Sequence, residues 1–293
     1  MVDMDVLTQP LPTLFISHGS PMTALEPREA GAFMQRLGPA LEGAFGRPRA
    51  VLAVSAHSLT REPVLLAAAR HAAVYDFGGF DPRLNTLRYD APGAPELALR
   101  VQALLQAADL PCHLLDQGGL DHGIWTPLRY LFPQAEIPVL PLAWPAHWPP
   151  TRLFALGQAL APLTAQGVLV LGSGSLTHNL QRVFAGGLRD IDRPATPEST
   201  AFRDWFAEQC ATGRMEALLD YRRQAPHAAL MHPTDEHLLP WFVAAGAGLP
   251  DGASAARRIH ASLTYGDLAM DAYAFGASAA QLFEARAGVS AVM

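Results

Sequence analysis

The feature that most constrains the fold of this chain is the alternation of short apolar runs with amphipathic segments. Five runs have the length and the Val, Ile and Leu content of buried strands: Thr13–Ser17, Ala50–His57, Val64–Ala68, Ile137–Leu142 and Val168–Leu171. Between them, apolar residues recur at the three- or four-residue spacing of helices: Glu26–Leu41, Pro95–Ala108, Thr151–Ala165, Glu198–Cys210 and Glu236–Ala245. Strands alternating with helices predict an α/β fold, with a mostly parallel central sheet and helices on both faces.

The last part of the chain has a different pattern. Ile259–Leu263 and Leu268–Phe275 flank the turn-forming segment 264–267, which predicts a pair of antiparallel strands at the edge of the sheet. No repeat, low-complexity block or shift in composition divides the 293 residues, so we expect a single domain over residues 1–293. The Ala- and Gly-rich tail after Phe283 is expected to fray.

Composition excludes several classes of partner. The formal net charge is −6 and no cluster of Lys or Arg occurs, which argues against nucleic acid. No apolar run reaches the ~18 residues of a membrane span, and the acidic first residues do not resemble a signal peptide. We therefore expect a cytoplasmic protein with no membrane partner. Cys112 and Cys210 form no C-x-x-C pair, so neither a disulfide framework nor a thiolate zinc finger is expected.

Five histidines lie beside small or turn-forming residues, where strands or helices are expected to end: His18, His57, His122, His178 and His237. Three of them close or follow apolar runs, and open α/β sheets bind ligands beyond the carboxyl ends of their strands. Imidazole is the commonest protein ligand for transition metals and also titrates near neutral pH. Together the five predict a metal site with an acid–base group beside it.

Each histidine also has an ordinary explanation, since a lone histidine at a strand end is usually capped or solvent-facing. His237 is expected at the start of the helix Glu236–Ala245, where Asp235 and Glu236 would offset the helix dipole. The helix dipole accounts for Asp235 and Glu236 but not for His237. The segment 172–175 is neither a nucleophile elbow nor a dinucleotide-binding loop, and the chain has no Walker lysine and no H-E-x-x-H.

Seven motifs, in order along nearly the whole chain, resemble those of the DODA-type extradiol ring-opening dioxygenases, which belong to the class III, LigB-like group that includes the bacterial and plant 4,5-DOPA dioxygenases. Each motif is weak alone, but seven in register are specific. They are His18-Gly19-Ser20-Pro21-Met22, Ser55-Ala56-His57, Tyr75-Asp76-Phe77-Gly78-Gly79-Phe80, Tyr89-Asp90-Ala91-Pro92-Gly93, Asp121-His122-Gly123-Ile124-Trp125, Ser173–Leu180 and Pro233–His237.

The resemblance implies one catalytic α/β domain with one divalent ion and no other cofactor. It implies that His18, His57 and His237 are metal ligands. It further implies that His178 is the acid–base group, close enough to the ion to count as a fourth ligand, and that His122 hydrogen-bonds a phenol oxygen or dioxygen. The remaining residues that the resemblance assigns, to a substrate-binding wall, are Asp76, Phe77 and Phe80.

The expected ligand set departs from that of the wider extradiol group in one respect. That group uses two histidines and a carboxylate, the set typical of non-haem iron(II). Here the third position is His237, with Glu236 adjacent. A site made only of imidazoles suits Zn²⁺ at least as well as Fe²⁺. Either ion is therefore expected.

The activity implied by the resemblance is ring opening of a catechol with O₂, such as 4,5-cleavage of DOPA. The partners would be a small aromatic diol and O₂, for a monomer or small homo-oligomer. Two other classes stay open. In a zinc-dependent hydrolase the metal would activate water, with His178 or Glu236 moving protons. In a non-catalytic metal-binding protein the histidines would only hold structure.

Overall fold

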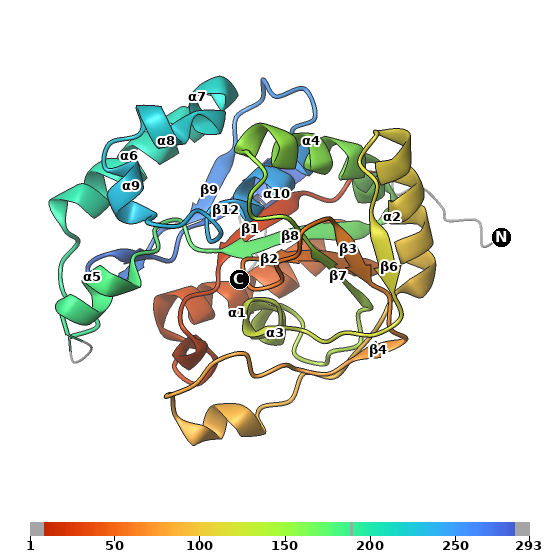
Figure 1. Ribbon diagram of the computed structural model, residues 1–293, viewed down its shortest axis with the longest axis horizontal. Helices are drawn as coiled ribbons and strands as arrows, with labels where there is room; N and C mark the ends of the chain where they lie inside the picture. Colours follow the sequence, from red (N-terminus) through yellow and green to blue (C-terminus); the bar gives the residue numbers. More distant parts are fainter. Residues whose placement is uncertain (1–8, 188–189, 285–293) are drawn as a thin grey trace, which may run out of the picture.

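The sheet at the centre of the molecule has eight strands in the order β6-β3-β7-β2-β8-β1-β12-β9 (Figure 1). The computed structural model describes residues 9–187 and 190–284, so residues 1–8 and nearly all of the tail after Phe283 lie outside the described residues. The strands are β1 (Thr13–Ser17), β2 (Ala50–Ser55), β3 (Val64–Leu66), β6 (His113–Leu115), β7 (Val139–Ala143), β8 (Val168–Gly174), β9 (Arg257–His260) and β12 (Ala272–Phe275).

The four central strands β7, β2, β8 and β1 are parallel, as the alternation of strands and helices predicts. At one edge, β12 pairs antiparallel with β1 and β9 pairs antiparallel with β12. At the other edge, β3 is antiparallel to β7 and parallel to β6. The predicted fold class, a mostly parallel sheet with antiparallel edge strands, is confirmed.

The predicted strand pair at the end of the chain is interrupted. Ile259–Leu263 overlaps β9 and a separate strand β10 (Leu263–Thr264), while Leu268–Phe275 divides into β11 (Leu268–Ala269) and β12. The break lies at Asp271, whose carbonyl accepts hydrogen bonds from the backbone and the hydroxyl of Ser17 and whose carboxylate pairs with Arg203. Asp271 is therefore held by contacts outside the ladder. A further short pair is β4 (Arg70–His71) with β5 (Ala91–Pro92).

Helices cover both faces of the sheet. Figure 1 shows α1 (Arg28–Phe45) and α3 (His122–Leu131) on one side, and α4 (Pro150–Leu160) and α10 (Pro240–Gly248) on the other. The remaining helical elements are α2 (Pro95–Ala107), α5 (Leu180–Ala185), α6 (Pro197–Ala211), α7 (Met215–Leu219), α8 (Tyr221–Gln224), α9 (Ala228–Met231), α11 (Gln281–Glu284) and the 3₁₀ turns η1 (Pro21–Ala24), η2 (Pro82–Thr86), η3 (Ala161–Gln166) and η4 (Ala277–Ala280).

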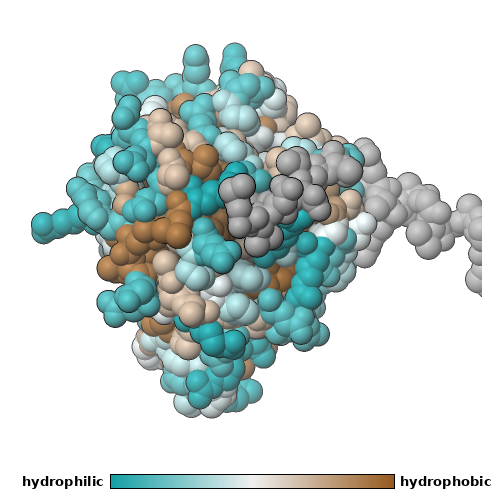
Figure 2. Space-filling model, turned by 90° about the vertical axis from the view of Figure 1, so that its right-hand side faces the viewer, coloured by the Kyte–Doolittle hydropathy of each residue, from teal (hydrophilic) through white to brown (hydrophobic). Residues whose placement is uncertain are grey.

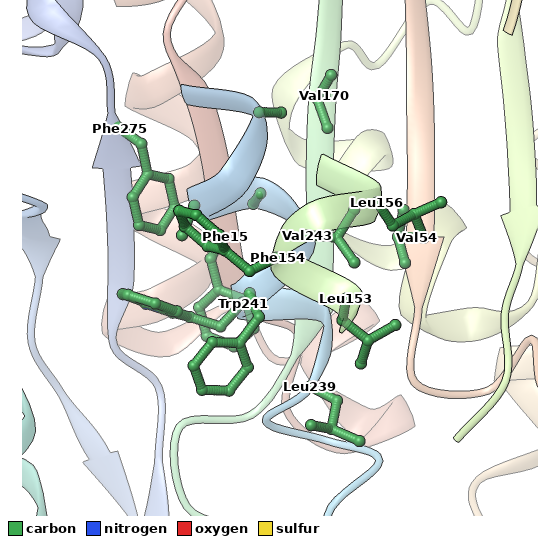
Figure 3. Packing of buried hydrophobic residues seen from close by; sticks show 14 of the residues in the cluster. Phe15, Val54, Leu153, Phe154, Leu156, Val170, Leu239, Trp241, Val243 and Phe275 are labelled. Carbon is green, nitrogen blue, oxygen red and sulfur yellow. The ribbon is translucent and has the colours of Figure 1, made fainter. Parts of the chain in front are cut away.

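The central strands are buried on both faces, because their alternate side chains enter different cores. In β1, Leu14 and Ile16 join the core with α1 and α3, whereas Phe15 joins the core with α4 and α10. Figure 3 shows Phe15, Phe275 and Trp241 of α10 close together, and the Trp241 and Phe275 rings pack edge to face with their centroids 5.1 Å apart. This packing sets the position of α10, and with it the turn that precedes it.

The helix predicted over Glu236–Ala245 begins later, at Pro240. A helix starting at Glu236 would place Pro240 in its interior, where proline has no N–H to donate and its ring clashes with the carbonyl four residues earlier. Residues 236–239 form a turn instead, in which the N–H groups of Leu238 and Leu239 donate to the Asp235 carbonyl. His237 consequently lies in a turn before the helix, not on the helix.

The outer surface is mixed in polarity. The face in Figure 2 shows hydrophobic patches separated by hydrophilic residues. Within residues 9–187 and 190–284, no helix combines the length and the apolar character that crossing a membrane requires.

Candidate metal centre

The carboxyl ends of β1, β2 and β8 meet at one edge of the sheet. Ser17 pairs with Gly174 and Ser55 with Ser173, so the three strands end level with one another. His18 directly follows β1, and His57 follows β2 after one intervening residue.

The other three histidines approach the same place from different elements. His178 lies four residues beyond β8, His122 is the first residue of α3, and His237 lies in the turn before α10. All five histidines line one cavity of about 300 Å³. The structure therefore brings together side chains that are up to 219 positions apart in the sequence, from 18 to 237.

The two imidazoles of His18 and His57 face each other with their Nε2 atoms 3.1 Å apart. The Ser173 hydroxyl donates its one proton to the Gly123 carbonyl, so it accepts a hydrogen bond from His18 Nδ1–H at 3.0 Å. His57 Nδ1 lies 3.7 Å from the carboxylate of Asp76. Both rings are therefore expected to carry their proton on Nδ1, His18 because of its hydrogen bond and His57 because of the charge of Asp76, which lies beyond hydrogen-bond distance. The Nε2 lone pairs of His18 and His57 then face each other, and the 3.1 Å separation of the two atoms favours a cation bound to both.

Burial keeps these rings uncharged at neutral pH. Desolvation, with the nearby His57 next in importance, holds the pKa of His18 well below its usual value. Desolvation and the neighbouring His122 lower the pKa of His57 to about 4, against the opposing effect of Asp76. The pKa of His237 is likewise lowered by burial first and by His178 second. Neutral imidazole is the form that binds a metal ion.

His237 is oriented by the residue next to it. Its Nδ1 donates to Glu236 Oε1 at 3.1 Å, and its carbonyl accepts from the N–H of Ser175 at 2.8 Å. Its ring centroid is 5.0 Å from that of His57 and 5.6 Å from that of His18. The Glu236 carboxylate is thus a hydrogen-bond acceptor behind an imidazole, and its charge offsets that of a bound cation.

His122 also lies beside His57, with ring centroids 4.1 Å apart. The ligand nitrogens of His18, His57 and His122 lie within 4.8 Å of one another, and the ligand atoms of His178, Glu236 and His237 form a second such group. His122 begins α3, and the Asp76 carboxylate accepts from both its backbone N–H and its Nδ1 at 3.0 Å.

His178 stacks on His237, with ring centroids 3.5 Å apart and planes 6° from parallel. Its backbone N–H donates to the Met231 carbonyl at 2.9 Å. Burial lowers the pKa of His178 to about 4, opposed by the charge of Glu236. The ring is therefore neutral at pH 7 and can accept a proton.

Aromatic and aliphatic side chains form the rest of the cavity. Phe77 and Phe80 line it, as the resemblance implies. Asp76 is not among the lining residues, because its carboxylate accepts hydrogen bonds from His122 behind the cavity. Helix α5, which was not predicted from the sequence, contributes Leu180, Val183 and Phe184 to the lining. The sequence held one signal for this helix, its N-cap Asn179, which accepts from the N–H of Arg182.

We expect Gly174→Ala to destabilise the protein and to weaken its metal binding. A Cβ atom at Gly174 would lie 1.9 Å from the carbonyl oxygen of His237, so the turn that carries His237 would have to move. Overpacking of this kind costs about 1–3 kcal/mol of the free energy of unfolding. Chemical denaturation and metal analysis check both effects, and Gly43→Ala, with open space at its Cβ, is the control. A stable Gly174→Ala protein with unchanged metal content would contradict the account of this turn.

We also expect the metal-free protein to lose stability when the pH falls from about 6.5 toward 4. Burial lowers the pKa of His57 and His178 to about 4, and that of His232, which donates to the Leu176 carbonyl, to about 3. The unfolded chain binds these protons at a higher pH than the folded one, so acid favours unfolding at about 1.4 kcal/mol per pH unit for each histidine. Denaturation curves between pH 7 and 5 measure the slope, and an unchanged midpoint would refute the prediction.

Fold and side chains together define the class: an α/β protein with a candidate mononuclear metal centre at the carboxyl edge of its sheet, beside an apolar, aromatic-walled cavity. Imidazole nitrogens of this kind suit divalent zinc and iron. Residues 12–276 match the family model described as the catalytic LigB subunit of aromatic ring-opening dioxygenase.

Curated relatives agree with the family match. The chain is 38% identical to a 4,5-DOPA dioxygenase extradiol of Beta vulgaris, over 90% of this chain and 96% of the relative. It is 36% identical to a protein of the same name from Escherichia coli K12, over 81% and 85% of the two chains. The crystal structure of an uncharacterized protein of Escherichia coli K12 is similar with a TM-score of 0.70 and 28% identity, covering 91% of this chain and all of that one.

The chain belongs to the LigB family of aromatic ring-opening dioxygenases. It is an extradiol ring-cleaving dioxygenase, of a family that depends on a metal ion and acts on aromatic substrates with O₂.

Proposed function

We propose that this enzyme opens the ring of a catechol with a charged side chain, such as DOPA at its 4,5 bond, with one divalent ion held by His18, His57 and His237. The observation that carries the proposal is the pair of Nε2 atoms 3.1 Å apart, each on a ring whose Nδ1 faces an acceptor, at the wall of an apolar cavity. The resemblance of Pro233–His237 to the family's motif supports the choice of His237 as the third ligand, and His122, whose ligand nitrogen lies within 4.8 Å of those of His18 and His57, is the alternative.

When bound, the ion would supply Lewis acidity that lowers the pKa of a phenol oxygen and, if it is iron(II), electrons for the reaction with O₂. Zinc has no accessible redox change. We therefore propose Fe²⁺ for the active protein, and expect a Zn²⁺-loaded form to bind catechol without opening it.

The residues around the cavity would transfer protons, bind the substrate and exclude water. His178, neutral because it is buried, would take a phenolic proton from the substrate and later return a proton to the product. His122, which lines the same cavity, would hold a substrate oxygen. Phe77 and Phe80 would pack against the ring and exclude water. Both oxygen atoms of O₂ enter the product as one carbon–carbon bond beside the diol breaks.

A second cavity supports a substrate with a charged substituent. It has a volume of about 370 Å³ and shares Ser20, Met22 and Tyr265 with the lining of the histidine cavity. Glu26 and Arg28 line it, and Arg28 pairs with Asp192 at 2.6 Å. Charges of both signs suit the ammonium and carboxylate groups of an amino acid. The curated relatives named above are 4,5-DOPA dioxygenases, which agrees with such a substrate.

The test is oxygen uptake by the iron(II)-loaded protein, measured with DOPA and with 4-methylcatechol, followed by mass spectrometry after reaction in ¹⁸O₂. We expect one O₂ consumed per catechol and two labelled atoms in the ring-opened product. Glu26→Gln should raise KM for DOPA and leave 4-methylcatechol unaffected. No uptake with any catechol would refute the proposal, and anaerobic cleavage of an ester or amide would favour a metal-dependent hydrolase instead.

We further propose that the whole chain acts as one catalytic domain in the cytoplasm, as a monomer or small homo-oligomer. The family model matches residues 12–276, which supports a single catalytic domain. Sedimentation of the purified protein measures the oligomeric state.

A further inference from the structure

We propose that Asp76 is the positioning residue of His122: it fixes the orientation and the tautomer of the ring, so that Nε2 presents a lone pair to the substrate. The tautomer assignment rests on the geometry alone. Its consequence for turnover rests on the proposed function.

Asp76 contacts both the side chain and the main chain of His122. Both carboxylate oxygens of Asp76 lie 3.0 Å from His122 Nδ1, and Oδ1 also accepts the backbone N–H of His122 at 3.0 Å. The residues are 46 positions apart, and the His122 side chain is 7% exposed. One carboxylate therefore holds the main chain and the side chain of the same histidine.

No neighbouring carboxylate replaces this contact. Asp121 is the N-cap residue of α3, but its side chain makes no capping hydrogen bond. Its two oxygens accept instead from the hydroxyls of Ser55 at 2.6 Å and Ser58 at 2.5 Å. Asp76 thus supplies, from a loop distant in sequence, the acceptor that the first N–H of α3 requires.

The tautomer decides what His122 can do. A carboxylate only accepts hydrogen bonds, so the ring nitrogen beside it must carry a proton. A neutral imidazole has one proton, which leaves Nε2 unprotonated in the cavity. His122 then accepts a hydrogen bond from a phenol O–H, and it cannot donate one while it stays neutral. Carboxylate–histidine pairs orient imidazoles in the same way elsewhere in proteins.

Asp76 also connects His122 to the wall of the cavity. The next residue, Phe77, packs its ring edge to face against His122, with centroids 5.6 Å apart. The carboxylate lies 3.7 Å from His57 Nδ1, which is beyond hydrogen-bond distance. Asp76 therefore acts on His57 only through its charge, and the metal should stay bound when Asp76 is replaced, provided that metal is supplied at saturation.

The first test compares Asp76→Ala, Asp76→Asn and His122→Ala in metal content, kcat and KM. Removing the carboxylate behind a metal-ligating histidine typically costs about 10–100-fold in metal affinity or activity, and we take the same range for His122. We expect Asp76→Ala to lower kcat by that factor with full metal content, and Asp76→Asn, whose amide oxygen still accepts from Nδ1–H, to recover part of the loss. In the His122→Ala background, Asp76→Ala should change kcat by less than about twofold, because the two residues act as one unit.

A control variant comes from the same loop. Asp81 caps η2 and pairs with Arg83, without contact to the histidines. Asp81→Ala should leave kcat within about twofold of wild type. Loss of metal from Asp76→Ala, or independent and additive effects of Asp76→Ala and His122→Ala, would overturn the positioning role.

The second test does not depend on turnover. Long-range ¹H–¹⁵N NMR spectra of the metal-free protein report which ring nitrogen of His122 carries the proton. We expect the Nδ1–H form in wild type and in Asp81→Ala, and a shift toward Nε2–H in Asp76→Ala. An Nε2–H form in wild type would overturn the proposal even if the enzyme is active. If no catechol is oxidised, the proposed function fails, but the spectra still show whether Asp76 sets the tautomer of His122. Failure of the proposed function and failure of the positioning role are therefore distinguishable.

Discussion

Replacing His57 with alanine is expected to remove the bound metal and, with it, all turnover. The Nε2 atom of His57 lies 3.1 Å from that of His18. We expect the metal content to fall from one ion per chain to less than about a tenth of an ion per chain, because the loss of one ligand lowers the affinity of the site for the ion. Elemental analysis after gel filtration measures the content, and circular dichroism shows that the chain remains folded.

Variants of other histidines make this result specific. His113→Ala is the matched control, because the His113 side chain is 64% exposed and pairs with Glu62. His237→Ala should lose the metal as His57→Ala does, whereas His122→Ala should keep it. Full occupancy in His57→Ala would contradict the site. If His122→Ala loses the metal and His237→Ala keeps it, His122 is the third ligand in place of His237.

His178→Ala is expected to keep the metal and to lose most of its turnover. General acid–base catalysis contributes about 10²–10⁴-fold to a rate, so kcat should fall within that range. The neutral, stacked ring of His178 is placed to accept a proton at the edge of the cavity. Oxygen uptake at saturating catechol, with metal content measured on the same sample, checks the prediction.

A second variant separates proton transfer from packing. His178→Asn fills part of the space against His237 but cannot act as an acid or base near neutral pH. It should be as slow as His178→Ala. Normal turnover in either variant would remove His178 from proton transfer. Loss of the metal would make it a ligand, consistent with its position 3.5 Å from the His237 ring.

The central sheet and the edge at which the site lies were predictable because their signals are local. An apolar run such as Ala50–Val54 specifies a buried strand, and Ser55-Ala56-His57 marks its end. Parallel strands bring such ends together without any further information. The approach of His18 to His57 follows from this rule once β1 and β2 lie on either side of β8.

The parts that could not be predicted depend on contacts between distant residues. Asp76 was expected in the substrate wall because the segment Asp76–Phe80 resembles the part of the family that forms the pocket wall, but its hydrogen bonds to His122 form only when the loop packs on α3. Helix α3 has Pro127 in its interior, which obscures the helical pattern. The late start of α10 was readable in principle from Pro240.

X-ray absorption at the metal edge of the iron- or zinc-loaded protein, recorded with and without a catechol, tests the metal centre most directly. We expect a shell of three imidazole nitrogens at about 2.0–2.2 Å, with further light-atom ligands that change when catechol is added. A sulfur shell, fewer than two imidazoles, or a spectrum that catechol leaves unchanged would contradict a three-histidine site open to substrate.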